Sequence, residues 1–382
     1  MKRLFLVGCL LAVSFATAQA AAAPRFGVAE DATKYAQDGG ASLFAQLREL
    51  GMTENRMVVR WNPNDPTTIQ DKAFLDRSIP VAQRVGIRIV FSVYATEAGG
   101  VSADPDARIA LFAGYLQTLA RTYPSVSTFI VGNEPNEAYF WQPQLGPDGA
   151  QLSAALYERL LAASYDALKA VSGSITVVGA GPSGDANDIS SISPVRFVKA
   201  LGDAYRASGR AAPLMDQLAF HVYPRANTDG PSKPRDWPNV GPADLDRLKQ
   251  AVWDAFAGTS QPTFHEGPAA PGGLTLMVDE FGWQAAVDPA HAAAYYGAEN
   301  VPTVSEDEQA RSTPPWSRLS SAIPSSRMRW RSTSWTRRTS TGSRVGSCAP
   351  TAHSDPPSRR CARRSPRQAH AHHRTCGRMP PG

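Results

Sequence analysis

Short apolar segments alternate with helical segments seven times between residues 25 and 284, and this alternation constrains the fold more than any other feature of the chain. The segments predicted as strands are residues 25–31, 56–62, 87–94, 126–132, 175–179, 216–223 and 274–280. The third is almost entirely apolar, which is typical of a parallel strand covered on both faces. Strands that alternate with helices predict an α/β fold with a parallel sheet.

The intervening segments have the spacing and the ends expected of helices. Within residues 106–123 the apolar side chains recur every three or four positions, and Asp104 followed by Pro105 is a typical helix start. Seven such repeats indicate either a (β/α)8 TIM barrel that lacks its eighth repeat or an open doubly wound sheet. No glycine-rich dinucleotide-binding turn follows the first predicted strand, and this favours the barrel.

Charge is distributed unevenly along the chain. The formal net charge is +5, but residues 311–382 contain 15 arginines, no lysine and one acid, Asp355. Residues 24–310 contain 22 basic and 33 acidic residues, a net charge of −11. Phosphate backbones are bound by basic surfaces, so we expect no nucleic-acid partner for this acidic part. We predict a globular domain over residues 24–310 and a basic, disordered tail over residues 311–382.

Residues 1–23 have the organisation of a secretory signal peptide. Lys2 and Arg3 precede an apolar run over residues 4–15, and Ala18-Gln19-Ala20 forms a small-residue cleavage site. The apolar run is too short to span a bilayer. We therefore expect a secreted protein, extracellular or periplasmic, without stable membrane association.

The cysteines all lie outside the predicted domain, at Cys9, Cys348, Cys361 and Cys376. Residues 24–310 therefore contain no disulfide, no thiol nucleophile and no zinc–thiolate site. We expect neither a metal nor a cofactor.

Two of the predicted strands carry a glutamate at or just after their carboxyl end. The fourth strand leads into Asn133-Glu134-Pro135-Asn136, and the seventh leads into Asp279-Glu280-Phe281-Gly282-Trp283. In a (β/α)8 barrel the active site lies at the carboxyl ends of the strands, so these side chains should meet at the mouth of the barrel. Two opposed carboxyl groups are the machinery of glycoside hydrolysis: one protonates the leaving oxygen, and the other attacks the anomeric carbon or activates water.

The two glutamate motifs, Asn133-Glu134-Pro135 and Glu280-Phe281-Gly282-Trp283, resemble those of glycoside hydrolase clan A, in particular families five and thirty-nine. The resemblance covers residues 25–310. It implies a retaining (β/α)8 glycosidase in which Glu134 is the acid/base and Glu280 the nucleophile. It also implies that Asn133 hydrogen-bonds the 2-hydroxyl of the sugar.

The resemblance extends to residues at the ends of the second and sixth strands. Arg60 resembles the arginine that keeps the nucleophile ionised, and His221 and Tyr223 resemble the pair that orients it. A cation and a phenol lower the pKa of a neighbouring carboxyl group, whereas the acid/base needs a more apolar setting. Asp279 and Glu280 are adjacent, so only one of them is expected to face the barrel axis.

Aromatic side chains near the strand ends are candidates for stacking on sugar rings. The complete set of predicted substrate-binding residues is Asn133, Arg60, His221, Tyr223, Trp283, Trp61 and Trp141. Alternative interpretations are a structural ion pair for Arg60, a hydrogen-bonded core histidine for His221 and loop packing for Trp141.

The composition changes abruptly at residue 311, where Ser, Arg, Thr and Pro become dominant. One interpretation is a disordered basic linker. Another is a shifted reading frame: codons for residues 317–343, read one nucleotide earlier, permit a helix, an Asp-Pro break and an apolar strand. Without that repeat the barrel would stay open, and its first and seventh strands would be exposed edges.

The sequence thus predicts a secreted retaining glycoside hydrolase with a carbohydrate substrate, mostly β-linked. One alternative is a non-catalytic carbohydrate-binding barrel, and another is an inactive, truncated form of the enzyme.

Overall fold

The computed structural model describes residues 25–264, 273–290, 301–313 and 329–332. Parallel strands form a closed barrel in sequence order within these residues, so the barrel prediction is confirmed and the open sheet is wrong. The strands are β1 (Arg25–Ala29), β2 (Glu54–Trp61), β3 (Arg88–Ala95), β4 (Thr128–Val131), β5 (Thr176–Gly179), β6 (Gln217–His221), β7 (Thr275–Glu280) and β8 (Arg329–Ser332).

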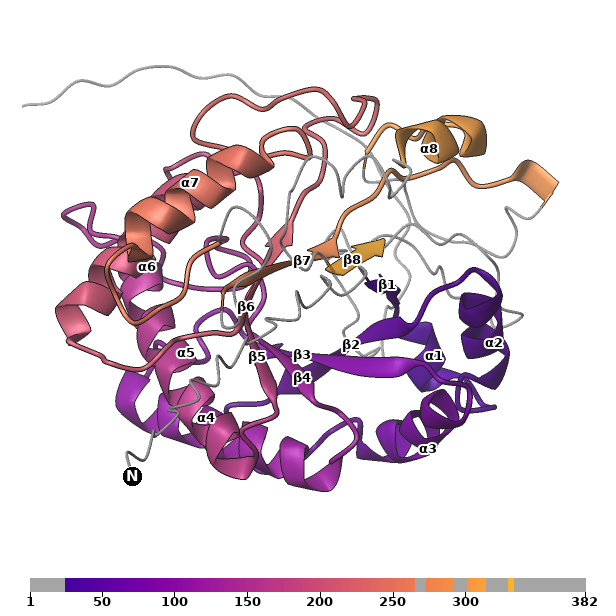
Figure 1. Cartoon of the computed structure of the whole chain (residues 1–382), viewed down its shortest axis with the longest axis horizontal. Coiled ribbons are helices and arrows are strands. Elements are labelled where there is room, and N and C mark those ends of the chain that lie inside the picture. The colour runs from indigo at the N-terminus through magenta and orange to yellow at the C-terminus, as the bar shows by residue number, and fades with distance from the viewer. Residues whose placement is uncertain (1–24, 265–272, 291–300, 314–328, 333–382) are drawn as a thin grey trace, which may run out of the picture. The chain divides into compact units, whose positions relative to one another are not determined.

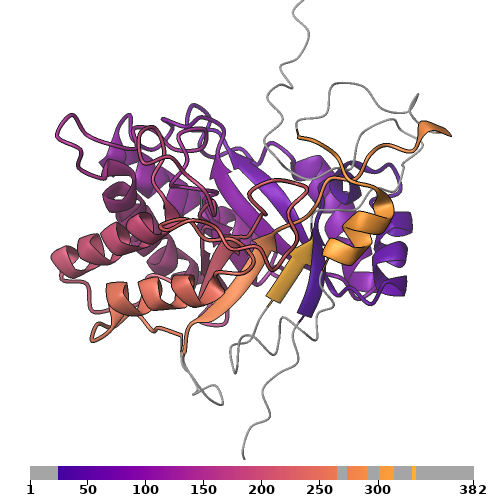
Figure 2. The same ribbon diagram turned by 90° about the horizontal axis from the view of Figure 1, so that it is seen from above.

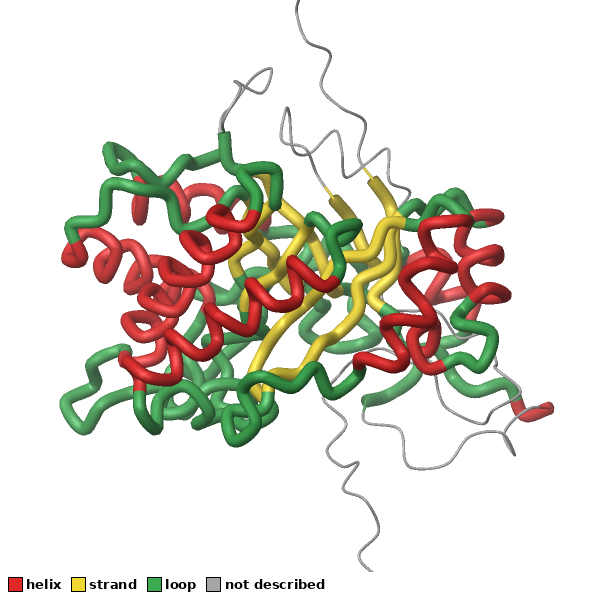
Figure 3. The backbone as a smooth tube through the Cα atoms, turned by 90° about the horizontal axis from the view of Figure 1, so that it is seen from below, coloured by secondary structure: helices red, strands yellow, loops and turns green. Residues whose placement is uncertain are grey.

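Helices lie outside the strands, as Figure 1 shows for α2 to α7. They are α1 (Ala32–Tyr35), α2 (Ala41–Glu49), α3 (Lys72–Arg84), α4 (Pro105–Thr122), α5 (Leu152–Val171), α6 (Pro194–Ser208), α7 (Leu245–Phe256) and α8 (Glu306–Ser312). In Figure 3 the red helices flank the yellow strands. The longer helices bury an apolar face against the barrel, as Phe112, Leu116 and Leu119 do in α4.

The eighth position of the barrel is occupied by a strand of only four residues. β8 pairs with four residues of β1 but with only Met277 and Val278 of β7. Figure 2 shows these three strands side by side. The gap expected between β7 and β1 is therefore filled by part of the segment predicted to be a tail. The shifted reading frame concerns the gene and stays a prediction.

The barrel interior is filled by one side chain from each of five strands: Val90, Ile130, Val178, Ala219 and Met277. Because Arg56 pairs in register with Val90, the alternation along β2 turns Arg56, Val58 and Arg60 towards the interior and the mouth. The intervening residues, such as Val59 and Trp61, pack outwards in the core beneath the helices. This alternation decides which polar side chains can reach the mouth.

The predicted signal peptide and the four cysteines lie outside the described residues. The helices that the structure describes include none long and apolar enough to cross a bilayer.

Candidate active site

The candidate site lies at the carboxyl ends of β4, β6 and β7, as the sequence predicted. After β4 the backbone turns sharply, with positive φ angles of 90° at Gly132 and 36° at Glu134. A positive φ is rare for a residue with a side chain and is typical of strained functional positions. The turn places Glu134 above the barrel, opposite Glu280 at the end of β7.

Glu134, His221 and Glu280 come together at this point. One carboxylate oxygen of Glu134, one of Glu280 and a ring nitrogen of His221 all lie within 4.8 Å of one another. Nδ1 of His221 is 2.7 Å from Oε1 of Glu134 and 3.6 Å from Oε2 of Glu280. His221 therefore hydrogen-bonds the predicted acid/base, whereas the sequence assigned it to the nucleophile.

The cation beside Glu280 is Arg56, which corrects the assignment of Arg60. Nη1 of Arg56 lies 2.9 Å from Oε1 of Glu280, and its Nη2 donates to Asn133 and to Ser92. The side chain is 2% exposed. The sequence offered a signal for it, since Arg56 and Arg60 lie four residues apart on the same face of β2. Only the strand register shows that the deeper arginine reaches Glu280.

Arg60 lies at the exposed rim of the barrel mouth. Its guanidinium carbon is 4.2 Å from the centre of the Tyr94 ring on the neighbouring strand β3. This distance is that of a cation–π contact.

Asp279 and Glu280 both face the interior, so the expectation that only one does is wrong. The pairing of β6 with β7 shifts between Phe220 and His221, and this irregularity sets His221 opposite Glu280. Oδ2 of Asp279 lies 3.3 Å from Nε of Arg56 and 3.4 Å from Nε2 of His221. A register shift between two strands cannot be predicted from the alternation of side chains along one strand. For this reason the sequence did not show that Asp279 faces the interior.

Tyr223 and Asn133 occupy the places that the sequence predicted. The Tyr223 hydroxyl donates to Oε2 of Glu280 over 3.2 Å. Arg56 has donors only, so its 2.9 Å contact fixes Oδ1 of Asn133 as an acceptor.

The charges of the site shift two pKa values. Burial raises the pKa of Glu280 above 4.5, and the positive charges of His221 and Arg56 oppose this only in part. Burial alone would lower the pKa of His221, but Glu280, Asp279 and the hydrogen bond to Glu134 outweigh it and raise the pKa well above 6.5. The predicted lowering of the nucleophile's pKa by a cation and a phenol is therefore outweighed by burial.

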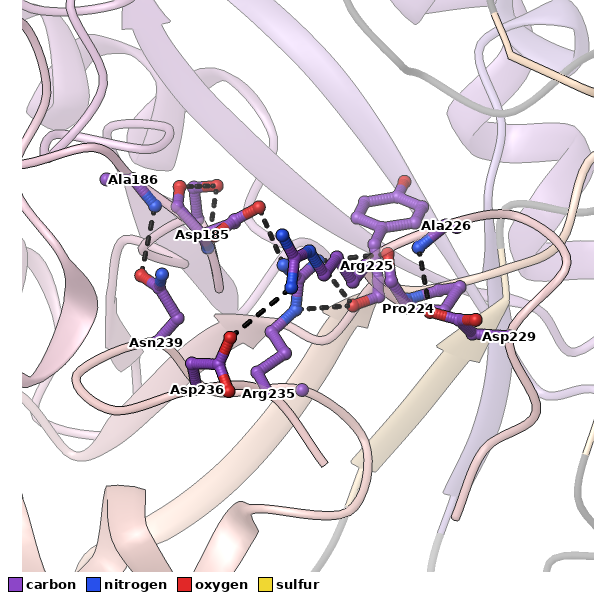
Figure 4. A network of polar contacts seen from close by, with 12 residues as sticks. Asp185, Ala186, Pro224, Arg225, Ala226, Asp229, Arg235, Asp236 and Asn239 are labelled. Carbon is purple, nitrogen blue, oxygen red and sulfur yellow. Dashed lines mark hydrogen bonds and ion pairs between the residues drawn. The ribbon is translucent and has the colours of Figure 1, made fainter. Parts of the chain in front are cut away.

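Polar contacts hold the loop after β6 in place, and Figure 4 shows those around Arg235. Arg235 donates to the backbone oxygens of Tyr223 and Pro224 and pairs with Asp185 at 2.7 Å. Asn239 accepts from the backbone nitrogen of Ala186, so the same loop is tied to the loop after β5. These bonds fix the backbone from which Tyr223 reaches Glu280.

The three predicted tryptophan platforms are buried. Trp61 is 0% exposed, and it packs edge-to-face on Phe112 beneath the helices. Trp283 is 1% exposed and donates to the backbone oxygen of Asp229. Trp141 is also buried, but it lines a small pocket beside Asn133 together with Tyr94 and Phe140. Strand ends carry aromatic residues that pack outwards as well as inwards, and this explains the error for Trp61.

Two further acidic residues near the strand ends have raised pKa values. Burial raises the pKa of Glu137 to about 7, with the charge of Glu134 adding to the effect. Burial also raises the pKa of Glu30 to about 7, although its carboxylate accepts a bond from the nitrogen of Ala32.

The spacing of Glu134, His221 and Glu280 is also compatible with three ligands of a metal ion. A divalent cation there would compete with Arg56 for Glu280 and would interrupt the bond between His221 and Glu134. The donor set therefore fits a cation poorly.

No protein-family model and no curated protein matches the chain. Solved structures do match. The chain is similar to a family 39 glycoside hydrolase from Bacteroides cellulosilyticus WH2, with 17% identity and a TM-score of 0.51 over 85% of this chain and 60% of the other. It is similar to a glucosidase from Croceicoccus marinus, with 13% identity and a TM-score of 0.52 over 81% and 59%.

An endo-1,4-β-mannanase from Rhizomucor miehei gives 12% identity and a TM-score of 0.50 over 81% of this chain and 85% of that one. The chain spans about three fifths of the length of the first two structures. At these identities the likeness concerns the fold, and it confirms the predicted resemblance at that level. The chain shares the barrel fold of these glycoside hydrolases.

Proposed function

We propose that the protein is a retaining glycoside hydrolase that acts on β-linked sugars. The observation that carries the proposal is the approach of Glu134 and Glu280, whose nearest oxygens lie within 4.8 Å. Carboxyl groups about 5–5.5 Å apart are typical of retaining enzymes, whereas inverting enzymes need about 6.5–9.5 Å to admit a water molecule. The fold likeness to glycoside hydrolases supports the same reading.

In the first step the Glu280 carboxylate attacks the anomeric carbon. The glycosidic C–O bond breaks, and the carboxylic acid of Glu134 gives its proton to the leaving oxygen. In the second step the Glu134 carboxylate takes a proton from water, whose oxygen attacks the anomeric carbon and releases Glu280. Arg56 and Tyr223 bind the two oxygens of Glu280 and fix its direction of attack.

The remaining predicted substrate contacts are part of the same proposal. Asn133 precedes Glu134 in the sequence, and because Arg56 occupies its Oδ1, its amide nitrogen is the donor proposed for a sugar hydroxyl. Arg60, stacked on Tyr94 at the rim, contacts the sugar chain further from the bond that is cleaved.

We also propose that residues 1–23 direct export, which N-terminal sequencing of the mature protein would test.

The test is a panel of aryl β-glycosides and β-linked polysaccharides, with the product anomer followed by NMR from the first turnover. Retention of configuration is expected, together with loss of activity in Glu134→Gln and Glu280→Gln. A 2-fluoro glycoside that traps the intermediate should label Glu280. Inverted product would contradict the double displacement, and unchanged binding without any turnover would identify a carbohydrate-binding barrel.

A further inference from the structure

We propose that Asp279 is a positioning residue: its carboxylate holds the Arg56 guanidinium and the His221 ring in the orientations in which they contact Glu280 and Glu134. The inference rests on the function proposed for those two glutamates.

The geometry places Asp279 behind both contacts. Asp279 is 0% exposed, and its Oδ2 lies 3.3 Å from Nε of Arg56 and 3.4 Å from Nε2 of His221. Each partner turns another nitrogen to a glutamate: Nη1 of Arg56 to Glu280 at 2.9 Å and Nδ1 of His221 to Glu134 at 2.7 Å. A single buried oxygen therefore orients the donors of both glutamates.

The backbone after β5 packs closely against both His221 and Asp279. A Cβ atom at Gly181 would lie 2.5 Å from Cδ2 of His221 and 2.8 Å from Oδ1 of Asp279. The backbone nitrogen of His221 also donates to the oxygen of Pro182. The uncharged backbone of Gly181 and Pro182 thus packs against Asp279 and His221.

The charges around His221 explain why the carboxylate of Asp279 must be ionised. The groups facing His221 are Glu134 from the loop after β4, Asp279 and Glu280 from β7, and Arg56 from β2 across those carboxylates. Arg56 and a protonated His221 balance Asp279 and Glu280. Without the charge of Asp279 one positive charge is in excess, and an arginine does not release its proton. His221 must then release one.

A neutral His221 ring keeps only one proton. The proton can then reside on Nε2, and Nδ1 in that tautomer does not donate to Glu134. Asp279→Asn preserves the shape of the side chain but removes the charge. It should therefore uncouple His221 from Glu134 while the barrel stays folded.

The direct test is the titration of His221 by NMR in the folded enzyme without substrate, with the signal assigned through His221→Gln. In the wild type His221 should keep both protons through neutral pH. In Asp279→Asn its titration should move down by at least about one pH unit. A wild-type His221 that titrates at or below 6.5, or an unchanged titration in the variant, would overturn the proposal.

Asp71→Asn is the matched control, because Asp71 pairs at 2.8 Å with the buried Lys34, whose ammonium group also donates to the backbone oxygen of Val58. It should lower stability and leave the His221 titration in place.

On an aryl glycoside, Asp279→Asn should lower kcat about tenfold or more, with a smaller change in KM. The basic limb of its pH profile should move to lower pH, and Asp279→Glu should restore part of that shift. Equal pH limbs in wild type and Asp279→Asn would show a merely structural role. If the wild type cleaves no glycoside, the proposed function fails, whereas the NMR titration still decides the role of Asp279.

Discussion

Nη1 of Arg56 lies 2.9 Å from Oε1 of Glu280, and both side chains are buried at the mouth of the barrel. Arg60, four residues later on the same face of β2, stacks on Tyr94 at the exposed rim. The two arginines therefore allow a matched comparison within a single strand.

We expect Arg56→Gln to lower kcat/KM by about 10²–10³-fold, because the proposed nucleophile loses its cation. It should also lower the free energy of unfolding by about 3–5 kcal/mol, since Glu280 and Asp279 stay buried without it. Arg60→Gln should leave kcat unchanged and raise only KM. Steady-state kinetics and urea denaturation measure both effects, and equal losses in the two variants would contradict this division of roles.

The acid limb of the pH profile should lie above pH 4.5, because burial raises the pKa of Glu280 and the attacking carboxylate must be ionised. The Tyr223 hydroxyl bonds the ionised form, so its removal raises the pKa further. Tyr223→Phe should move the acid limb of kcat/KM upwards by about one pH unit. An acid limb that moves to lower pH in this variant would show that the hydroxyl does not stabilise the carboxylate.

A methyl group at position 181 should displace His221, because the added Cβ would approach its ring to 2.5 Å. We expect Gly181→Ala to lower kcat about 10²-fold, since a misplacement near 1 Å is enough for such a loss. Gly173→Ala, where no atom lies within 4 Å of the added Cβ, is the control and should keep full activity. Wild-type kinetics in Gly181→Ala would mean that the packing against His221 is loose.

Removal of divalent metal ions should leave the activity unchanged. Arg56 holds Glu280, and His221 holds Glu134, so the two carboxylates already have partners of suitable charge. The measurement is activity after prolonged dialysis against a chelator, with the addition of calcium, zinc or magnesium as the reverse arm. A loss that one of these ions restores would replace the double displacement by metal-assisted hydrolysis.

Restoring the reading frame after residue 310 should raise the melting temperature and the soluble yield. Among the residues that the structure describes, β8 pairs with only Met277 and Val278 of β7, the strand that carries Glu280. A complete eighth strand would pair with more of β7. Resequencing the codons for Gln309 to Pro314 tests the shift itself. Identical stability of the two forms would show that four residues of β8 suffice.

The sequence predicted the elements of the barrel and the two glutamates because these depend on local patterns. Parallel strands covered on both faces are apolar throughout, and a glutamate directly after such a strand is conspicuous. The structure places Glu134, Glu280, Asn133 and Tyr223 together, where the sequence expected them.

The arginine and the aspartate of the site were missed because their positions depend on pairing between strands. Arg56 and Arg60 have the same periodicity, and only the register with Val90 shows which is deeper. Asp279 reaches the interior through the irregularity beside His221. The prediction that the tryptophans bind sugar was wrong for a similar reason, because their burial depends on how the helices pack on the barrel.

The register shift between β6 and β7, which lies between Phe220 and His221, matters for the design of a similar site in another barrel. In a regularly paired strand, consecutive side chains point to opposite faces of the sheet. Asp279-Glu280 placed on a regular strand of another barrel would therefore direct one carboxylate into the barrel interior and the other towards the helices. The irregular pairing between β6 and β7 is therefore needed to reproduce the site, together with the residues themselves.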